Sequence, residues 1–309
     1  MLWDGSRSLP WARRHSPIHF ETPDGIKSNA RKVTMDRKVT MEMTKDQVTS
    51  LTAGKMKLKI YPSKRAAGEA AALAVAEELR RLDQLRDQIG VIFATGAAQF
   101  DTLEFLTSTA GLPWKKVRGF HLDEYVGLDE NHPASFRSFL RQRLTQRVSM
   151  GAFFEMDGTA QDLEAVCRDY IKELHVAEPQ LCLLGIGENG HLAFNEPAEA
   201  DFHDPLEMKI VTLDLMCRQQ QAAEGWFPSW QEAPERALTL TIPTVFRVPK
   251  LIASVPGPRK AQVIRRTVHD PISTACPSTL LRTHPDVTVY LDVDSAAELE
   301  GISPTAANG

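Results

Sequence analysis

The sequence LCLLGIG at residues 181–187 joins four apolar residues to a glycine-rich turn, and this stretch decides the fold class. A short, continuous apolar run is typical of a strand that is buried on both faces of a parallel sheet. Similar runs recur on both sides of it and alternate with stretches of helical periodicity, such as residues 72–82. This alternation predicts an α/β fold with an open, mostly parallel sheet and helices on both faces.

The predicted elements fill most of the chain from residue 56 to residue 291, and no internal repeat is visible. Strands are predicted at 56–60, 91–94, 117–122, 181–184, 208–213, 237–241, 250–255 and 287–291. Helices are predicted at 63–88, 99–109, 134–147, 160–175, 214–224, 259–269 and 277–282. Ser63 is the expected N-cap of the first helix.

The first fifty residues differ from the rest of the chain. They hold nine Lys and Arg against six Asp and Glu, and no period of 2 or 3.6 persists in them. They also lack the apolar core of about 7 to 15 residues that a signal peptide needs. We expect residues 1–54 to be a disordered leader or an over-extended start, and residues 55–309 to form a single domain.

The composition argues against several classes of protein. A net charge of −4 over 309 residues lacks the basic excess of a nucleic-acid binder. No apolar run reaches the roughly 20 residues of a membrane span. The cysteines form no C-x-x-C pair, so we expect neither a zinc site nor a disulfide framework, but free thiols in the reducing cytoplasm. The four cysteines are Cys167, Cys182, Cys217 and Cys276.

Ligands of open parallel sheets bind beyond the carboxyl ends of the strands, so the loops that follow the strands are informative. The turn at residues 94–99 leads into a helix and could bind a phosphate through backbone N–H groups. Its glycine, however, has an equally plausible backbone role. The later turn at residues 256–260 offers Arg259 or Lys260 to complete an anion site, or simply exposes two solvated charges.

The loop at residues 119–128 carries the adjacent carboxylates Asp123 and Glu124 directly after a strand. Both cannot point into the sheet, so at least one can project into a cleft. There it could act as a base towards a C–H bond beside a carbonyl. The alternative is a carboxylate that caps a helix or braces the loop.

The loop at residues 185–197, GIGENGHLAFNEP, follows the central strand and places three glycines in six positions. Such a backbone can crowd a ligand and hold His191 in a fixed pose. Glu196 follows five residues later, so the loop supplies an ionisable pair whose histidine can titrate near neutral pH.

LDEYVGL at residues 122–128 and GIGENGHLAFNEP at residues 185–197 resemble the two catalytic segments of the glucosamine-6-phosphate deaminase (isomerase) family, sister to 6-phosphogluconolactonase. The resemblance implies a modified Rossmann-like fold and no metal or organic cofactor. It also implies the conversion of glucosamine 6-phosphate and water to fructose 6-phosphate and ammonia, a step of amino-sugar catabolism.

Carried over position by position, the resemblance implies that His191 opens the sugar ring, that Glu196 orients His191, and that Asp123 moves the C2 proton. Asn189 stands where the best-known bacterial members have Asp, so we expect a less basic His191 and more reliance on Glu196. The phosphate would lie on the 95–99 turn with Lys260, and Arg218 would stand in for the family's arginine. The substrate-binding residues expected in all are Thr95, Gly96, Ala97, Ala98, Gln99, Glu124, Gly187, Gly190, Arg218 and Lys260.

Two alternatives to the deaminase stay open at this point. A sugar-phosphate lactonase would be expected to show Asp-Glu-Arg in the first motif, where this chain has Tyr125. A non-catalytic sugar-phosphate sensor would need only the anion site. In each case the expected partner is a small sugar phosphate, not a nucleic acid or a membrane, and the formation of a homo-oligomer is left open.

Overall fold

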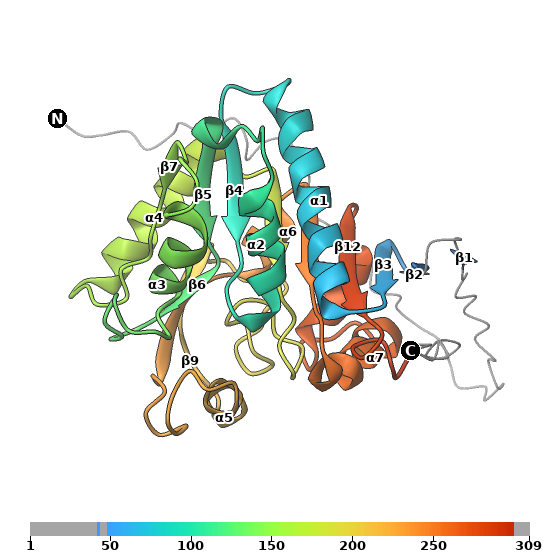
Figure 1. Ribbon diagram of the computed structural model, residues 1–309. Coiled ribbons are helices and arrows are strands. Elements are labelled where there is room, and N and C mark those ends of the chain that lie inside the picture. The colour runs from blue at the N-terminus through green and yellow to red at the C-terminus, as the bar shows by residue number, and fades with distance from the viewer. Residues whose placement is uncertain (1–41, 44–47, 300–309) are drawn as a thin grey trace, which may run out of the picture. The chain divides into compact units, whose positions relative to one another are not determined.

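The large sheet organises the molecule (Figure 1). The computed structural model describes residues 42–43 and 48–299. Within them, nine strands pair in the order β1-β2-β3-β12-β11-β8-β4-β5-β7. The strands are β1 (Glu42–Met43), β2 (Thr49–Ala53), β3 (Met56–Tyr61), β12 (Val287–Asp292), β11 (Lys250–Ser254), β8 (Leu181–Leu184), β4 (Ile89–Phe93), β5 (Val117–His121) and β7 (Ala152–Phe153). All neighbours from β3 to β7 are parallel, which confirms the predicted open, mostly parallel sheet.

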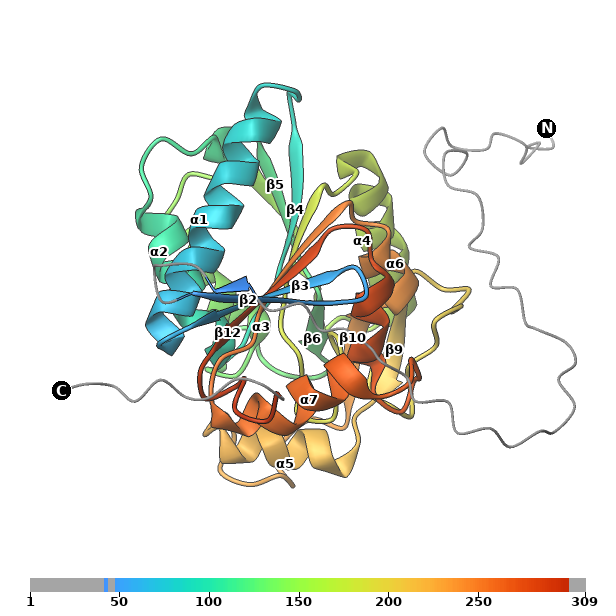
Figure 2. The same cartoon turned by 90° about the vertical axis from the view of Figure 1, so that its right-hand side faces the viewer.

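Helices cover both faces of this sheet, as the alternating sequence pattern predicts. In Figure 2, α1 and α2 lie on one side of the sheet and α4 and α6 lie on the other. The α-helices are α1 (Lys64–Asp83), α2 (Phe100–Ser108), α3 (Phe136–Leu140), α4 (Leu163–Ala177), α5 (Leu215–Ala223), α6 (Ile242–Phe246) and α7 (Ala261–His269). One π-helical turn (Arg141–Thr145) extends α3, and the predicted helix at 277–282 is a 3₁₀ helix (Pro277–Thr283).

The first helix illustrates how the local sequence sets an element. The Ser63 hydroxyl accepts a hydrogen bond from the backbone N–H of Ala66, which confirms Ser63 as the N-cap. Val75 and Leu79, from the predicted apolar face, are fully buried against the sheet. The helix ends at Asp83, five residues before the predicted end, because the chain must turn back into β4 at Ile89.

The boundary of the expected leader needs a correction. Residues 49–53 lie inside the range predicted as leader, yet they form β2, which pairs antiparallel with β3. Leu51 and Ala53 are buried in the core, so this strand is stabilised by apolar contacts that the sequence pattern of residues 1–54 did not reveal. Residues 1–41 and 44–47 of that range lie outside the described residues.

A second, antiparallel sheet was not predicted. β6 (Asp123–Tyr125), β10 (Arg236–Leu240) and β9 (Met208–Thr212) pair in the order β6-β10-β9. The strands predicted near 208–213 and 237–241 therefore exist but belong to this smaller sheet. Its edge strand β6 begins two residues after β5 ends, so the chain passes directly from the large sheet to the small one at Asp123.

Candidate active site

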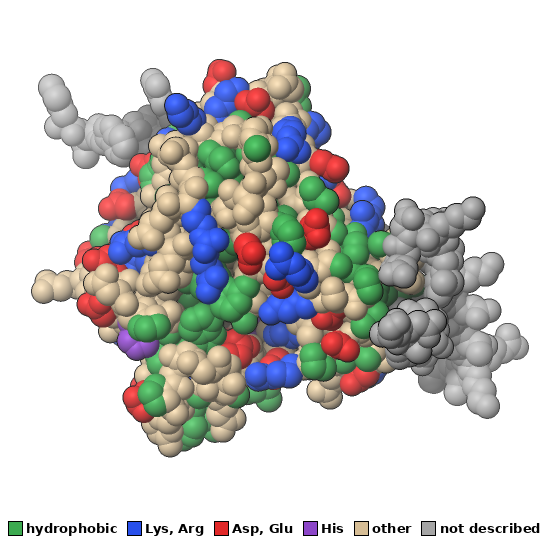
Figure 3. Space-filling view, viewed as in Figure 1, with side chains coloured by type: hydrophobic (Ala, Val, Ile, Leu, Met, Phe, Trp, Pro, Cys, Tyr) green, Lys and Arg blue, Asp and Glu red, His purple; other side chains and the backbone are tan. Residues whose placement is uncertain are grey.

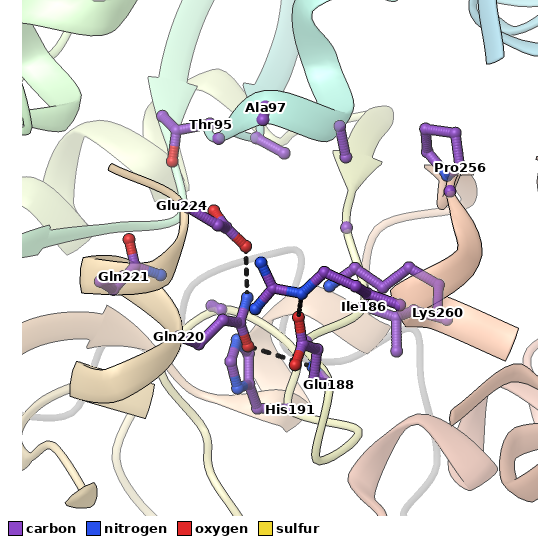
Figure 4. Close-up of a pocket in the computed structure, with 18 of the residues that line it drawn as sticks. Thr95, Ala97, Ile186, Glu188, His191, Gln220, Gln221, Glu224, Pro256 and Lys260 are labelled. Carbon is purple, nitrogen blue, oxygen red and sulfur yellow. Dashed lines mark hydrogen bonds and ion pairs between the residues drawn. The ribbon is translucent and has the colours of Figure 1, made fainter. Parts of the chain in front are cut away.

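A cavity of about 310 Å³ opens at the carboxyl ends of the central parallel strands, where the sequence placed the ligand. Its walls come from the turns after β4, β8 and β11, from β6, and from α5. Among the predicted site residues, the cavity is lined by Thr95, Gly96, Ala97, Ala98, Asp123, Gly187, His191 and Lys260. Figure 4 shows Thr95 and Ala97 on one wall and His191 across from them.

The turn after β4 adds no charged side chain to the cavity wall. Gly96 has φ 90° and ψ 170°, a conformation open almost only to glycine, and a 3₁₀ turn (Ala97–Gln99) follows and leads into α2. The predicted ligand Gln99 does not line the cavity. Its amide Nε2 donates to the Leu184 carbonyl over 3.0 Å, so this buried side chain braces the turn against β8 instead of binding substrate.

The two adjacent carboxylates point to different places. Asp123 lines the cavity, and burial together with the nearby Glu124 raises its pKa well above the usual range. Glu124 is fully buried and accepts hydrogen bonds from the backbone N–H groups of Phe136 and Arg137 and from the Ser135 hydroxyl. Glu124 therefore anchors the start of α3 and does not line the cavity, where it was expected to bind substrate.

Buried polar groups fix the backbone at Asp123. The His121 Nε2 accepts from the Met156 backbone N–H over 2.8 Å, so its Nδ1 carries the proton and donates to the Asp123 carbonyl over 2.8 Å. Burial lowers the pKa of His121 to about 3, which keeps the ring neutral. The Tyr170 hydroxyl accepts from the His121 backbone N–H and donates to its carbonyl. Sequence reasoning missed this support, because a lone His and a helical Tyr carry no motif.

Asn189 accepts two hydrogen bonds from His191. Its Oδ1 accepts from the His191 backbone N–H over 3.0 Å and from the ring Nδ1–H over 2.8 Å. The Nε2 lone pair is therefore the one left for chemistry. Burial and the Lys260 charge lower the pKa of His191 to about 3. The effect expected from Asn in place of Asp stays a prediction. Asn189 itself does not line the cavity.

The glycines of this loop have two different roles. A Cβ on Gly187 would lie 2.1 Å from the His191 ring, so glycine is needed there for the ring to lie against the backbone. Gly190 has φ 92°, and a Cβ on it would lie 2.5 Å from the Cys276 sulfur. Gly190 was expected to bind substrate, but it does not line the cavity and packs against Cys276.

Glu196 lies behind His191 and not on the cavity wall. It is fully buried, and its Oε2 accepts from the Asp214 backbone N–H over 2.7 Å. Burial raises the pKa of Glu196. A ring nitrogen of His191, a Glu196 oxygen and the Cys217 sulfur all lie within 4.8 Å of one another. The sequence thus identified a real neighbour of His191, one that can act only through that residue.

The turn after β11 brings two cations to the cavity. Gly257 has φ 98°, and the 3₁₀ turn that follows (Pro258–Lys260) leads into α7. Arg259 and Lys260 both line the cavity. The Arg259 Nε lies 2.6 Å from a Glu188 oxygen, and burial lowers the pKa of Lys260. Lys64, at the start of α1, is a third cation of the cavity wall, and sequence reasoning missed it.

Arg218, expected as a phosphate ligand, does not line the cavity. Its Nε donates to the Ala233 carbonyl over 3.1 Å, and its guanidinium group lies over the Trp230 ring. Three other residues in and just after α5 lie on the cavity wall instead. These residues are Gln220, Gln221 and Glu224 (Figure 4).

The α5 residues on the wall follow helical spacing from the buried Cys217, at i+3, i+4 and i+7. That spacing was readable in the sequence, but nothing in it indicated which helix face meets the cavity. Gln220 joins α5 to the loop after β8: its Oε1 accepts from the Glu188 backbone N–H over 3.3 Å, and its Nε2 donates to Glu224 over 2.8 Å.

Other predictions concern what the protein does not contact. None of the helices in the described ranges is long and apolar enough to cross a membrane. Basic and acidic side chains intermingle on the face shown in Figure 3, which agrees with the near-neutral net charge. All four cysteines are free and buried, as their spacing predicts.

Comparisons with known proteins identify the family of this chain. Residues 62–290 match the family model described as glucosamine-6-phosphate isomerases/6-phosphogluconolactonase. A glucosamine-6-phosphate deaminase of Arthrobacter sp. is 32% identical over 250 residues, which is 79% of this chain and 93% of that protein. One of Streptomyces avermitilis is 33% identical over 251 residues, with the same coverage.

Solved structures agree on the fold. A structure described as a monomeric glucosamine-6-phosphate deaminase has a TM-score of 0.72 at 30% identity and covers 78% of this chain and 99% of its own. A putative 6-phosphogluconolactonase from Neisseria gonorrhoeae has a TM-score of 0.62 at 19% identity, covers 76% of this chain and 98% of its own, and is evidence for the shared fold alone. The family match and the relatives above 30% identity together place this chain among the enzymes of the glucosamine-6-phosphate isomerase and 6-phosphogluconolactonase family.

Proposed function

We propose that the protein converts glucosamine 6-phosphate and water to fructose 6-phosphate and ammonia, in the cytoplasm, as a step of amino-sugar catabolism. The observation that carries the proposal is that Asp123 and His191 line the same cavity, opposite a backbone turn suited to phosphate. One open-chain sugar can then reach both groups. The names of the relatives support the same substrate.

Ring opening falls to His191. Its free Nε2 takes the proton of the O1 hydroxyl and returns it to the ring oxygen O5, so the C1–O5 bond breaks and C1 becomes an aldehyde. A histidine with a lowered pKa is neutral at working pH and has the lone pair ready for this step. Asn189 fixes the ring orientation, and Glu196 acts behind it as a positioning residue.

Proton transfer between carbons falls to Asp123. The C2 proton becomes acidic once the C1 aldehyde stands beside it, and the Asp123 carboxylate removes it. The developing O1 enolate takes a proton from the substrate's own ammonium group, which gives an enolamine. Return of the proton to C1 leaves an iminium at C2, to which water adds and from which ammonia departs. The raised pKa of Asp123 makes the carboxylate a stronger base when it is ionised.

The phosphate has a binding place between two turns. Residues 95–98 line one part of the cavity wall, and Arg259 and Lys260 line another. Backbone N–H groups at the start of α2 donate towards an anion, and the two cations balance its charge. Arg259 thus takes the place first given to Arg218.

Product analysis with purified protein tests the proposal. Ammonia and fructose 6-phosphate should form in equal amounts from glucosamine 6-phosphate, while 6-phosphogluconolactone should yield no acid above its spontaneous hydrolysis. Asp123→Asn should still bind substrate but lose turnover by about 1,000-fold. Release of acid from the lactone would favour the lactonase, and binding without turnover in the unmodified protein would favour the sensor.

Asn189→Asp tests the role assigned to His191. A carboxylate beside the imidazole favours the protonated ring, so the pKa of His191 should rise and the acid limb of the rate profile should move to higher pH. An unchanged pH profile would refute the view that Asn189 keeps His191 weakly basic.

A further inference from the structure

Three potential metal ligands lie close together beside the candidate active site. A ring nitrogen of His191, a carboxylate oxygen of Glu196 and the sulfur of Cys217 lie within 4.8 Å of one another. Across the described part of the chain, this is the one trio of potential metal ligands with such spacing. The reaction proposed above uses the imidazole and the carboxylate, but it gives the thiol no role.

The polar contacts around the trio leave the inward-facing atoms available. Asn189 occupies Nδ1 of His191, and the Asp214 N–H occupies Oε2 of Glu196. Glu196 is fully buried, its Oε1 has no N–H or O–H partner among the described residues, and the thiol of Cys217 donates a hydrogen bond to the carboxylate. The outer contacts thus orient one nitrogen lone pair and one carboxylate oxygen, as second-layer groups do around metal ligands.

We propose that His191, Glu196 and Cys217 bind a thiophilic divalent cation, Zn²⁺ or Cd²⁺, and that the ion inhibits the enzyme. Nitrogen, oxygen and sulfur ligands at about 2.0–2.3 Å from Zn²⁺ would lie about 3.3–3.8 Å apart in a tetrahedral site. The trio must therefore contract by about 1 Å. Thiolate selects soft ions of this kind over Mg²⁺ or Ca²⁺.

Binding of the ion is a balanced proton exchange. The thiol of Cys217 gives up its proton to solvent as the metal–sulfur bond forms, so one proton leaves for each ion bound. The ion then holds the Nε2 lone pair of His191 and blocks ring opening. The binding follows from the structure alone, whereas the inhibition rests on the proposed function.

Titration of the full-length protein with Cd²⁺ alone, without substrate, tests the site. The ultraviolet absorbance of a cadmium–thiolate bond should rise and saturate at one ion per chain, with release of one proton. Cys217→Ser should abolish the absorbance and weaken binding by about 100-fold. Glu196→Gln, which retains the thiol, should keep the absorbance but weaken binding by about 10-fold.

Cys276→Ser is the matched control, because Cys276 is also a buried thiol and packs against Gly190 of the same loop. It should leave the cadmium titration unchanged. Thermal unfolding without ion checks that each variant folds. The inference fails if the unmodified protein gives no cadmium–thiolate absorbance, or if Cys217→Ser retains it. Cadmium binding by a protein that releases no ammonia would instead refute the proposed function and leave the metal site standing.

Discussion

Two turns flank the central strand β8 and have nearly the same backbone. Gly96 after β4 has φ 90° and ψ 170°, and Gly257 after β11 has φ 98° and ψ 155°. In each case a single 3₁₀ turn follows, its third residue donates its N–H to the glycine carbonyl over 3.0 Å, and an α-helix begins. The third residues, Gln99 and Lys260, are therefore structural equivalents.

The side chains of Gln99 and Lys260 nevertheless make different contacts. Gln99 points inward and binds the Leu184 carbonyl at the end of β8, whereas Lys260 lines the cavity beside Arg259. Both turns line the cavity, but only the second adds charged side chains. In the proposed phosphate site one half is therefore an uncharged turn and the other half carries cations, so substitutions in the two halves should have different effects.

The largest expected effect comes from removing the charge of Lys260, the cationic member of the pair. Lys260→Met should lower kcat/KM for the sugar phosphate by about 100-fold, mainly through KM, because a charge-assisted contact to phosphate is lost. Gln99→Met should change KM by less than about threefold while lowering the free energy of unfolding, since the Leu184 carbonyl loses its partner. Steady-state kinetics and urea unfolding measure the two outcomes. An equal change in KM for Lys260→Met and Gln99→Met would contradict the different roles given to the two turns.

Replacing either glycine by alanine should lower the free energy of unfolding by a similar amount. Gly96→Ala and Gly257→Ala each force a side chain into a backbone region that is almost exclusive to glycine, at a cost of about 1–3 kcal/mol. Neither added Cβ would meet another atom within 4 Å, so the cost is backbone strain alone. Urea unfolding should give similar losses for both variants. A loss confined to one of them would contradict the shared geometry.

A smaller effect is expected from Arg259, whose side chain is about half exposed and already paired with Glu188. Arg259→Gln should raise KM about tenfold with little change in kcat. Glu188→Gln is the contrasting variant, because it frees the guanidinium group from its ion pair and should leave KM equal or lower. A rise in KM for both variants would mean that the ion pair, and not the free cation, supports substrate binding.

The smallest effect concerns the charge that the cationic turn exerts on His191. Burial is the larger cause of the lowered pKa of His191, and Lys260 is the second. A neighbouring cation disfavours imidazolium, so Lys260→Met should raise the pKa of His191 but leave it below 6.5. NMR titration of the imidazole measures the shift. Arg259→Gln serves as the comparison and should leave this pKa unchanged.

The sequence predicted the parts of the site that local patterns encode. The apolar run of β8 and the glycines after it placed His191 at the sheet edge, and adjacency after β5 placed Asp123 there too. The same local reasoning could not separate Asp123 from Glu124. Which carboxylate faces the cavity depends on the small sheet, whose strands β9 and β10 come from 80 or more residues further along the chain.

The predicted site residues that lie away from the cavity have a common physical explanation. Gln99 and Arg218 are polar and lie near the motifs in sequence, yet each meets a backbone carbonyl that tertiary packing brings to it. Conversely, Lys64 reaches the cavity from the start of α1, whose sequence reads only as a helix. Side-chain direction at a site built from distant segments is a tertiary property.

The nine-residue helix α5 carries Gln220 and Gln221, and Glu224 follows it as the C-cap. None of these three residues belongs to the strand of Asp123 or to the loop of His191. If the proposed function is correct, substitutions in this one segment could change which sugar is accepted while the residues proposed to transfer protons stay in place.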